Sequence, residues 1–382
     1  MDFYQSCVRP LLFRFDPERI HVRTIRAARA AGRSNIARGA LERLYRFEDP
    51  RLRLRIAGLD FPNPIGLPGG FDKNGLAVQG IATAGFGFLD VGSVSLHPSE
   101  GNPERPRLFR LPLDESIRIY YGVPNDGSET VARRLAGIRL PAPLGINLVE
   151  TNTGKPAPAE EVIEEIAQAY RPFQGLTDYI VINMACPNSG GGVSALDDPA
   201  NLALLLQAFR RYGSLPPMFL KMHFAPEPKL IDALLEAVDP YEFVKGFMPG
   251  PDNKLPPVLK TPREQLERTR GSITGPHKRE SANEVMRVWY SRIDRSRHIL
   301  VSAGGIFSAE DAYERIRLGA SLVQVYTALV YRGPGLVKRI KQGLCALLER
   351  DGLQHISQAI GVEHETKPGK TPLHARTGAR AA

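Results

Sequence analysis

Two lysines lie in or just after apolar segments, where a charged side chain needs a partner of opposite charge. The kind of partner that suits them indicates which chemistry the site could perform. Lys73 follows the segment 64–70, and Lys221 lies inside the segment 218–224. Burial of an ammonium group without a partner costs several kcal/mol. An anionic cofactor would be such a partner. A carboxylate in the core is the alternative, although the nearby segments contain few acids.

Three asparagines stand near the ends of apolar segments. Asn147 lies in the segment 143–149, and Asn183 and Asn188 bracket the end of the segment 179–185. An amide side chain has one acceptor oxygen and two donor hydrogens. Several amides in one pocket therefore suit a planar heterocycle with alternating N–H and C=O edges. Each asparagine taken alone is more typical of a turn.

The stretch CPNSGGG, residues 186–192, holds the one candidate nucleophile or base among these segment ends, Cys186. A thiol accepts a proton near neutral pH when a cation such as Lys73 lowers its pKa. The alternative is a buried, inert cysteine. The other two cysteines, Cys7 and Cys345, are far from it in sequence, so we expect neither a disulfide framework nor a metal site.

A glycine pair near the C-terminus is typical of a phosphate-binding loop. Gly304 and Gly305 end the segment SAGG, and the segment VYTA, residues 325–328, follows. Backbone N–H groups at a glycine turn and at a helix start bind anions. A tight turn between a strand and a helix is the alternative.

Short apolar segments of β type alternate with helical patterns after residue 53, and these elements must position the side chains above. Apolar strands that alternate with helices predict a parallel sheet covered on its outer face. Eight such units favour a closed (β/α)8 TIM barrel over an open doubly wound sheet, and chemistry then belongs at the carboxyl ends of the strands. The expected strands are 64–70, 86–94, 143–149, 179–185, 218–224, 242–248, 299–305 and 322–329.

The N-terminal segment, residues 1–40, predicts a separate pair of amphipathic helices rich in arginine. Asp16 is the expected N-cap of the second helix, with Pro17 at its first position. Such helices lie in a membrane interface, or they pack on the barrel as a cap. We expect contact with a membrane and none with nucleic acid, and no apolar stretch approaches the ~18 residues of a spanning helix.

Two further boundaries follow from the same patterns. The barrel is expected over residues 41–362. A disordered basic tail is expected over residues 363–382, because this segment is polar, rich in Gly and Pro, and without periodicity.

The chain resembles the dihydroorotate dehydrogenase family, and in particular its membrane-associated, quinone-reducing class. The likeness rests on FDPERIH, NPIGLPGGFDKNG, GFGFLDVGSVSLHPSEGNPERPRLFRLP, PLGIN and AGGIFSAEDAYERIRLGASLVQVYTALVYRGPG. It implies a (β/α)8 barrel that binds FMN and oxidises dihydroorotate to orotate in pyrimidine biosynthesis. It also implies an N-terminal helix pair that docks on the membrane and admits quinone, which places the protein at the cytoplasmic face of the inner membrane.

The resemblance also assigns roles by position. Cys186 would be the catalytic base, Lys73 would contact both FMN and substrate, and Arg110 would line the quinone tunnel. Asn183, Asn188 and Ser189 would bind the substrate. The remaining FMN contacts would be Gly69, Gly70, Ser93, Asn147, Asn183, Lys221, Gly275, Gly304, Gly305, Tyr326 and Thr327.

Departures from the family pattern gather on the substrate side. Ile119 and Tyr120 replace an asparagine and an arginine, and Gly246, Phe247 and Met248 replace Thr-Asn-Thr at the end of the sixth strand. Cys186 stands where quinone-linked members carry serine, and Glu150 stands where a lysine is usual. Each lost hydrogen bond to a polar ring costs roughly 1 to 3 kcal/mol when its partner stays desolvated.

Three hypotheses follow. The chain is a dihydroorotate:quinone oxidoreductase with an altered pocket, a flavin enzyme of this fold for another substrate, or a non-catalytic subunit of a membrane protein complex. The first is the leading hypothesis because no feature of the sequence identifies another substrate.

Overall fold

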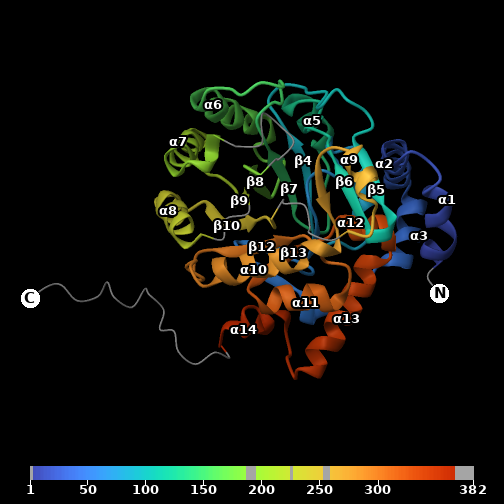
Figure 1. The fold of residues 1–382 in the computed structure, drawn as a ribbon. Helices are drawn as coiled ribbons and strands as arrows, with labels where there is room; N and C mark the ends of the chain where they lie inside the picture. Colours follow the sequence, from blue (N-terminus) through green and yellow to red (C-terminus); the bar gives the residue numbers. More distant parts are fainter. Residues whose placement is uncertain (1–2, 186–194, 224–226, 253–258, 366–382) are drawn as a thin grey trace, which may run out of the picture.

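A closed ring of eight parallel strands forms the centre of the molecule (Figure 1). The structure is a computed structural model that describes residues 3–185, 195–223, 227–252 and 259–365. Around the ring the strands are ordered β10-β12-β13-β3-β4-β7-β8-β9. Their bounds are β3 (Ile65–Leu67), β4 (Phe88–Val94), β7 (Leu144–Leu148), β8 (Tyr179–Asn183), β9 (Met218–Met222), β10 (Val244–Pro249), β12 (Ile299–Ala303) and β13 (Ala320–Gln324).

Each expected strand is present, so the predicted (β/α)8 barrel is confirmed. The last one differs most from its expected range of 322–329. It ends at Gln324, and Thr327 begins a helix. An apolar run of this length fits a buried strand or a buried helix equally well, so its periodicity alone did not separate the two.

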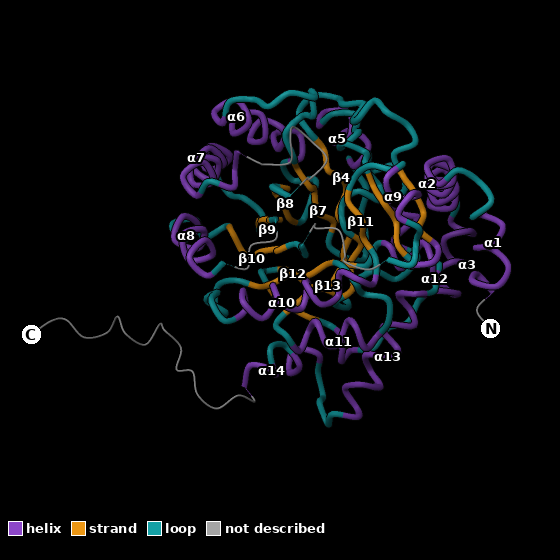
Figure 2. The backbone as a smooth tube through the Cα atoms, viewed as in Figure 1, coloured by secondary structure: helices purple, strands orange, loops and turns teal. Residues whose placement is uncertain are grey.

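Helices surround the ring of strands on its outside (Figure 2). Most begin with acidic side chains, Pro or a capping oxygen, as helix N-termini favour; Ser308 and Asp311, for instance, form a capping box on α11. Their bounds are α4 (Val78–Ala82), α5 (Ser128–Leu135), α6 (Ala159–Tyr170), α7 (Pro199–Phe209), α8 (Pro228–Val238), α9 (Arg263–Glu267), α10 (Arg279–Tyr290), α11 (Ala309–Arg317), α12 (Thr327–Arg332), α13 (Leu336–Arg350) and α14 (Val362–Glu365).

Two small antiparallel sheets lie outside the ring. The hairpin of β1 (Leu54–Ile56) and β2 (Leu59–Phe61) precedes the first barrel strand. A second sheet has the order β11-β6-β5 and is built from β5 (Leu108–Leu111), β6 (Ser116–Ile119) and β11 (Ser272–Thr274). The second sheet joins segments more than 150 residues apart, because Ile119 pairs with both Leu108 and Ser272.

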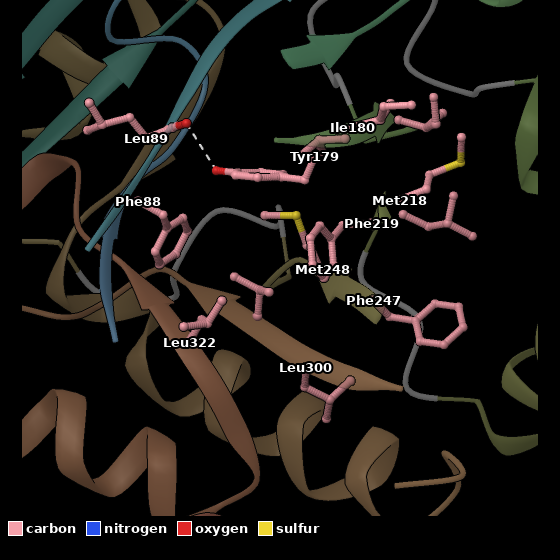
Figure 3. Close-up of a cluster of buried hydrophobic side chains, with 14 of the residues drawn as sticks. Phe88, Leu89, Tyr179, Ile180, Met218, Phe219, Phe247, Met248, Leu300 and Leu322 are labelled. Atoms are coloured by element: carbon pink, nitrogen blue, oxygen red, sulfur yellow. Dashed lines mark hydrogen bonds between the residues drawn. The ribbon is translucent and has the colours of Figure 1, made fainter. Parts of the chain in front are cut away.

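The barrel interior is packed with apolar side chains from several strands (Figure 3). Ile180 and Leu300 are fully buried, and the Tyr179 hydroxyl donates to the Leu89 carbonyl at 3.0 Å. Such a core excludes water, so polar groups at the ends of the strands bond to one another or to a ligand.

The N-terminal helices pack against the barrel, and this packing requires glycine. They are η1 (Tyr4–Val8), α1 (Arg9–Leu12), α2 (Pro17–Arg33) and α3 (Asn35–Tyr45). A Cβ at Gly80 of α4 would lie 1.9 Å from the Ala28 carbonyl oxygen of α2. The Asp16 side chain accepts from the Arg19 N–H at 2.8 Å, so the expected N-cap is confirmed.

Both ends of the barrel domain differ by a few residues from the expected boundaries. The helical extension continues past residue 40, because α3 reaches Tyr45. At the other end α14 reaches Glu365, so the expected tail does not begin at 363. Glu363 accepts from the Arg317 guanidinium at 2.9 Å, and the His364 ring lies 4.7 Å from that of Tyr290. These contacts fold the first residues of the tail onto α11 and α10.

We predict that Gly80→Ala destabilises the protein although alanine favours helices. The added methyl would overlap the α2 backbone, and such overpacking costs about 1 to 3 kcal/mol. Gly39→Ala in α3 is the matched control, since a Cβ there would meet nothing within 4 Å. Urea unfolding should rank Gly80→Ala below the wild type and Gly39→Ala at or above it. Equal stability of the two variants would show that α2 does not pack tightly on α4.

Candidate active site

A cavity of about 310 Å³ opens at the carboxyl ends of the barrel strands, within the range of small-molecule sites. The second sheet and α12 complete the wall of the cavity, to which they contribute Ile119, Thr274 and Thr327. Of the residues predicted to bind cofactor or substrate, the cavity is lined by Gly69, Gly70, Lys73, Ser93, Asn183, Lys221, Gly304, Gly305, Tyr326 and Thr327.

The other predicted residues lie elsewhere. Gly275 is not part of the cavity wall; a Cβ there would lie 1.9 Å from the Ser116 Oγ, so glycine allows β11 and β6 to approach. Arg110 lies against the N-terminal helices, with its guanidinium 4.5 Å from the Phe13 ring and donating to the Phe15 carbonyl at 3.0 Å. Cys186, Asn188 and Ser189 lie outside the described residues.

A chain of side-chain hydrogen bonds joins three neighbouring strands beneath the cavity. The Asn183 Nδ2 donates to the Ser93 Oγ at 2.8 Å, and the Ser93 hydroxyl donates to the Asn147 Oδ1 at 2.6 Å. The Asn147 Nδ2 is buried and has no hydrogen-bond partner among the described residues. The Asn147 side chain lies next to Gly69, where a Cβ would approach it to 3.1 Å. A buried donor without a partner is costly, so this amide is available to a ligand atom at Gly69 and Ser93.

The glycine pair after β12 adopts backbone angles that favour glycine. Gly304 and Gly305 have φ of +95° and +72°, and a Cβ at Gly305 would lie 2.5 Å from the Arg279 nitrogen. The fully buried Arg315 supports this loop from α11, donating to the Ser302 Oγ at 2.7 Å and to the Gly304 carbonyl at 3.1 Å. The loop therefore presents backbone rather than side chain to the cavity.

Lys221 has a carboxylate near it as well as the cavity. Burial raises the pKa of Asp90, and hydrogen bonds from Tyr179 and Gln324 together with the Lys221 charge oppose that rise. The Gln324 Nε2 donates to the Asp90 Oδ2 at 2.8 Å. The alternative of a core carboxylate partner thus holds for Lys221, which also lines the cavity.

Lys73 lies at the side of the cavity that faces the N-terminal helices. Its Nζ is 4.1 Å from the centre of the Tyr121 ring, and Arg107 lies 5.2 Å from the same ring. Burial, followed by repulsion from Arg107, lowers the pKa of Lys73 to about 8. The neighbouring His21 of α2 packs on Phe71 at 5.3 Å, and burial and the Lys73 charge lower its pKa to about 3.

Glu18 of α2 holds Arg107 in place. Its carboxylate lies 2.6 Å from the Arg107 Nη2 and 2.9 Å from the Arg105 Nη1. Glu18 and Arg107 are both buried. The ion pair therefore connects the N-terminal helices to Tyr121 and, through its ring, to Lys73.

The structure corrects one expectation about which residues line the substrate side of the cavity. Ile119 lines the cavity, as expected of a residue in the substrate wall, whereas Phe247 and Met248 do not. Phe247 is fully buried beside Trp289 of α10, with ring centres 5.1 Å apart, and Figure 3 shows Met248 turned toward the barrel interior. Gly250 and Pro251 line the cavity at this strand end instead. Side chains alternate in direction along β10. The residues at this strand end that line the cavity, Gly250 and Pro251, lie three residues further along the chain than Phe247 and Met248, where the family pattern indicated the wall.

Several polar residues of the wall were not singled out from the sequence, among them Lys278, Thr274 and His223. Lys278 is buried and its Nζ donates to the Asp252 carbonyl. The Lys278 Cβ lies 3.5 Å from a Cβ built at Gly304, so this lysine stands next to the glycine loop. Lys278 and Thr274 flank Gly275 in SITGPHK, a stretch without periodicity, and only the fold brings it to the cavity.

Comparison with known proteins gives the family. A family model described as dihydroorotate dehydrogenase matches residues 51–348. The chain belongs to the dihydroorotate dehydrogenase family. It is 38% identical over 371 residues to a protein of Gloeobacter violaceus named dihydroorotate dehydrogenase (quinone), covering 94% of this chain and 99% of that protein. A Halobacterium salinarum protein of the same name is 36% identical over 362 residues, 93% of this chain and 99% of the relative.

A solved structure agrees in fold. A dihydroorotate dehydrogenase of Eimeria tenella, in complex with ferulenol, superposes with a TM-score of 0.75 at 26% identity and covers 91% of this chain and 96% of its own. The chain is thus an enzyme of the dihydroorotate dehydrogenase type.

We predict that Glu18→Gln destabilises this family member strongly. The change leaves Arg107 buried without its counter-charge, and breaking a buried pair in this way costs about 3 to 5 kcal/mol. Asp60→Asn is the control, since Asp60 and Arg55 lie 3.8 Å apart with both side chains more than 80% exposed, and exposed pairs contribute under about 1 kcal/mol. Urea unfolding at neutral pH measures both. A Glu18→Gln variant as stable as the Asp60→Asn variant would contradict the ion pair's role.

Proposed function

We propose that this protein binds FMN in the cavity and oxidises dihydroorotate to orotate, with a quinone as the electron acceptor, in pyrimidine biosynthesis. The observation that carries the proposal is the Asn183–Ser93–Asn147 chain, which ends in a buried amide donor without a described partner. The names of the relatives support the substrate and the acceptor.

The residues in and next to the cavity fit FMN. Asn147 lies next to Gly69 of the cavity wall and bonds to Ser93, and its amide suits a flavin ring atom, since the ring edge carries both N–H and C=O groups. The loop at Gly304 and Gly305 suits the phosphate, with Lys278 beside it. Lys221 adds positive charge at the end of β9. When bound, FMN would take up the hydride that the substrate loses.

The protein's own part is to hold the substrate and to accept its proton. We assign Cys186 as the base, with Lys73, Asn183, Asn188 and Ser189 binding the substrate ring. Asn183 and Lys73 both line the cavity, and the residue before Cys186, Ala185, lines it too. Lys73 supplies a cation, and because its pKa is about 8 this charge is present at neutral pH and lost as pH rises further.

A second candidate, a flavin enzyme for another substrate, is favoured by one observation. Ile119 lines the cavity where the family pattern has an asparagine, and Gly250 and Pro251 line it without a polar side chain. A desolvated ring oxygen without a donor weakens binding by roughly tenfold or more.

Anaerobic addition of dihydroorotate to the purified yellow protein separates these candidates. We expect the flavin absorbance to bleach and to return when a quinone analogue is added. Cys186→Ala should slow the bleaching about 10²- to 10⁴-fold with FMN content unchanged, because the proton then lacks its acceptor. Yellow protein that dihydroorotate does not bleach would instead support another substrate, and colourless protein would contradict the proposed binding of FMN.

We propose further that the N-terminal helices dock the protein on the cytoplasmic face of the inner membrane. Among the described residues, no helix is both long enough and apolar enough to cross a bilayer. Large apolar side chains are nonetheless exposed on these helices beside arginines, and this arrangement suits an interface. They are Phe3, Leu11, Phe15, Val22, Ile36 and Leu44. Arg110, bound to the end of α1, would then line the path by which quinone reaches the cavity.

Charge placed on this surface should release the protein from membranes. We expect Leu11→Glu together with Ile36→Glu to reduce sedimentation with anionic liposomes about tenfold or more. The matched control is Leu204→Glu with Leu230→Glu, which changes two exposed leucines of α7 and α8. Equal loss of binding in both pairs, or no loss in the first, would refute docking through the N-terminal helices.

A further inference from the structure

The wall of the cavity formed by the end of β10 offers backbone and proline in place of polar side chains. Gly250 and Pro251 line the cavity there. The Gly250 N–H donates to the Met222 carbonyl at 3.0 Å, so the ends of β9 and β10 stay paired up to this point. A polar substrate that meets this wall must find its hydrogen bonds on the neighbouring strand end.

His223, the residue after β9, supplies a polar side chain at that place. Its ring lines the cavity, and its Nε2 is buried without a hydrogen bond to any described residue. The nearest acidic oxygen is the Asp197 Oδ2, 3.8 Å from the Nε2, at the end of the short helix η5 (Ala195–Asp197). The His223 side chain is 22% exposed and that of Asp197 is 38% exposed.

His223 and Ala185 follow two paired strand ends. Asn183 of β8 pairs with Lys221 of β9, and Ala185 and His223 each come two residues after one of these partners. Both line the cavity. Cys186, the proposed base, is the next residue after Ala185 in the sequence.

The Asp197 carboxylate lies near the His223 ring and orients it. The cavity wall that holds His223 also carries three lysines, Lys73, Lys221 and Lys278. An N–H of the His223 ring would donate a hydrogen bond to an anionic oxygen, and a bond to a charged partner is stronger than a bond between neutral groups.

We propose that His223 recognises the anionic, carboxylate-bearing ring of the substrate, and that Asp197 is its positioning residue. His223 thereby offers a hydrogen-bond donor at a wall where Ile119, Gly250 and Pro251 offer no polar side chain. The inference rests on the proposed function and adds a specificity residue to it.

Calorimetric titration of orotate into the oxidised holoenzyme tests this assignment without turnover. We expect the wild type to bind orotate at neutral pH. His223→Asn should bind orotate about 10- to 100-fold more weakly. Asp197→Asn should weaken binding less, because it keeps the His223 donor and removes only the carboxylate that orients it.

Two further variants keep the result interpretable. His97→Asn, which changes an exposed histidine outside the cavity wall, should bind orotate as the wild type does. His223→Gln keeps a neutral donor, so it should bind with intermediate affinity, and it replaces His223→Asn if that variant does not fold. FMN content and thermal midpoint confirm that each variant is intact.

The outcomes separate this inference from the proposed function. If the wild type binds orotate and both His223 variants retain its affinity, the inference is wrong and the proposed function stands. If the wild type neither binds orotate nor is bleached by dihydroorotate, the proposed function is wrong and the assignment of His223 is refuted with it.

Discussion

The hydrogen-bond chain from Asn183 through Ser93 to Asn147 fixes how three neighbouring barrel strands end. Each member is buried, and each comes from a different strand, β8, β4 or β7. Because the chain contains more donor hydrogens than acceptors inside the described structure, it leaves the Asn147 Nδ2 open. The apolar core below cannot satisfy this donor. A ligand with an acceptor atom would satisfy this donor.

Two contacts of different physical kinds attach the N-terminal helices to this barrel. At Gly80 the attachment is steric, since the α2 backbone lies where a side chain would be. At Glu18 it is electrostatic, through the buried ion pair with Arg107. The second contact also reaches the cavity, because Arg107 and Lys73 share the Tyr121 ring. The segment with the exposed apolar side chains is thus joined directly to the wall of the candidate active site.

The sequence predicted the barrel because apolar β segments and helical patterns alternate eight times, and it predicted much of the site because glycines, lysines and amides recur at the segment ends. The direction of the Phe247 side chain could not be predicted in this way. Its type suggested an apolar substrate wall, but the direction of its side chain depends on the register of β10, which places it against Trp289. Lys278 reaches the cavity through the fold alone, because the segment that holds it carries no period or motif. His223 lies in an expected strand, 218–224, but its type alone indicated no role. The boundary at residue 40 was wrong because the helix continues through Gly39 and ends only at Tyr45.

The central claim is that the open amide at the end of the hydrogen-bond chain is part of a flavin site. Titration of FMN into the apoprotein, followed by flavin fluorescence, tests it directly. The account predicts one FMN bound per chain, and a loss of affinity of about tenfold or more in Asn147→Leu, which removes the donor at similar volume. An apoprotein that binds no FMN, or an Asn147→Leu variant that binds it as tightly as the wild type, would contradict the account.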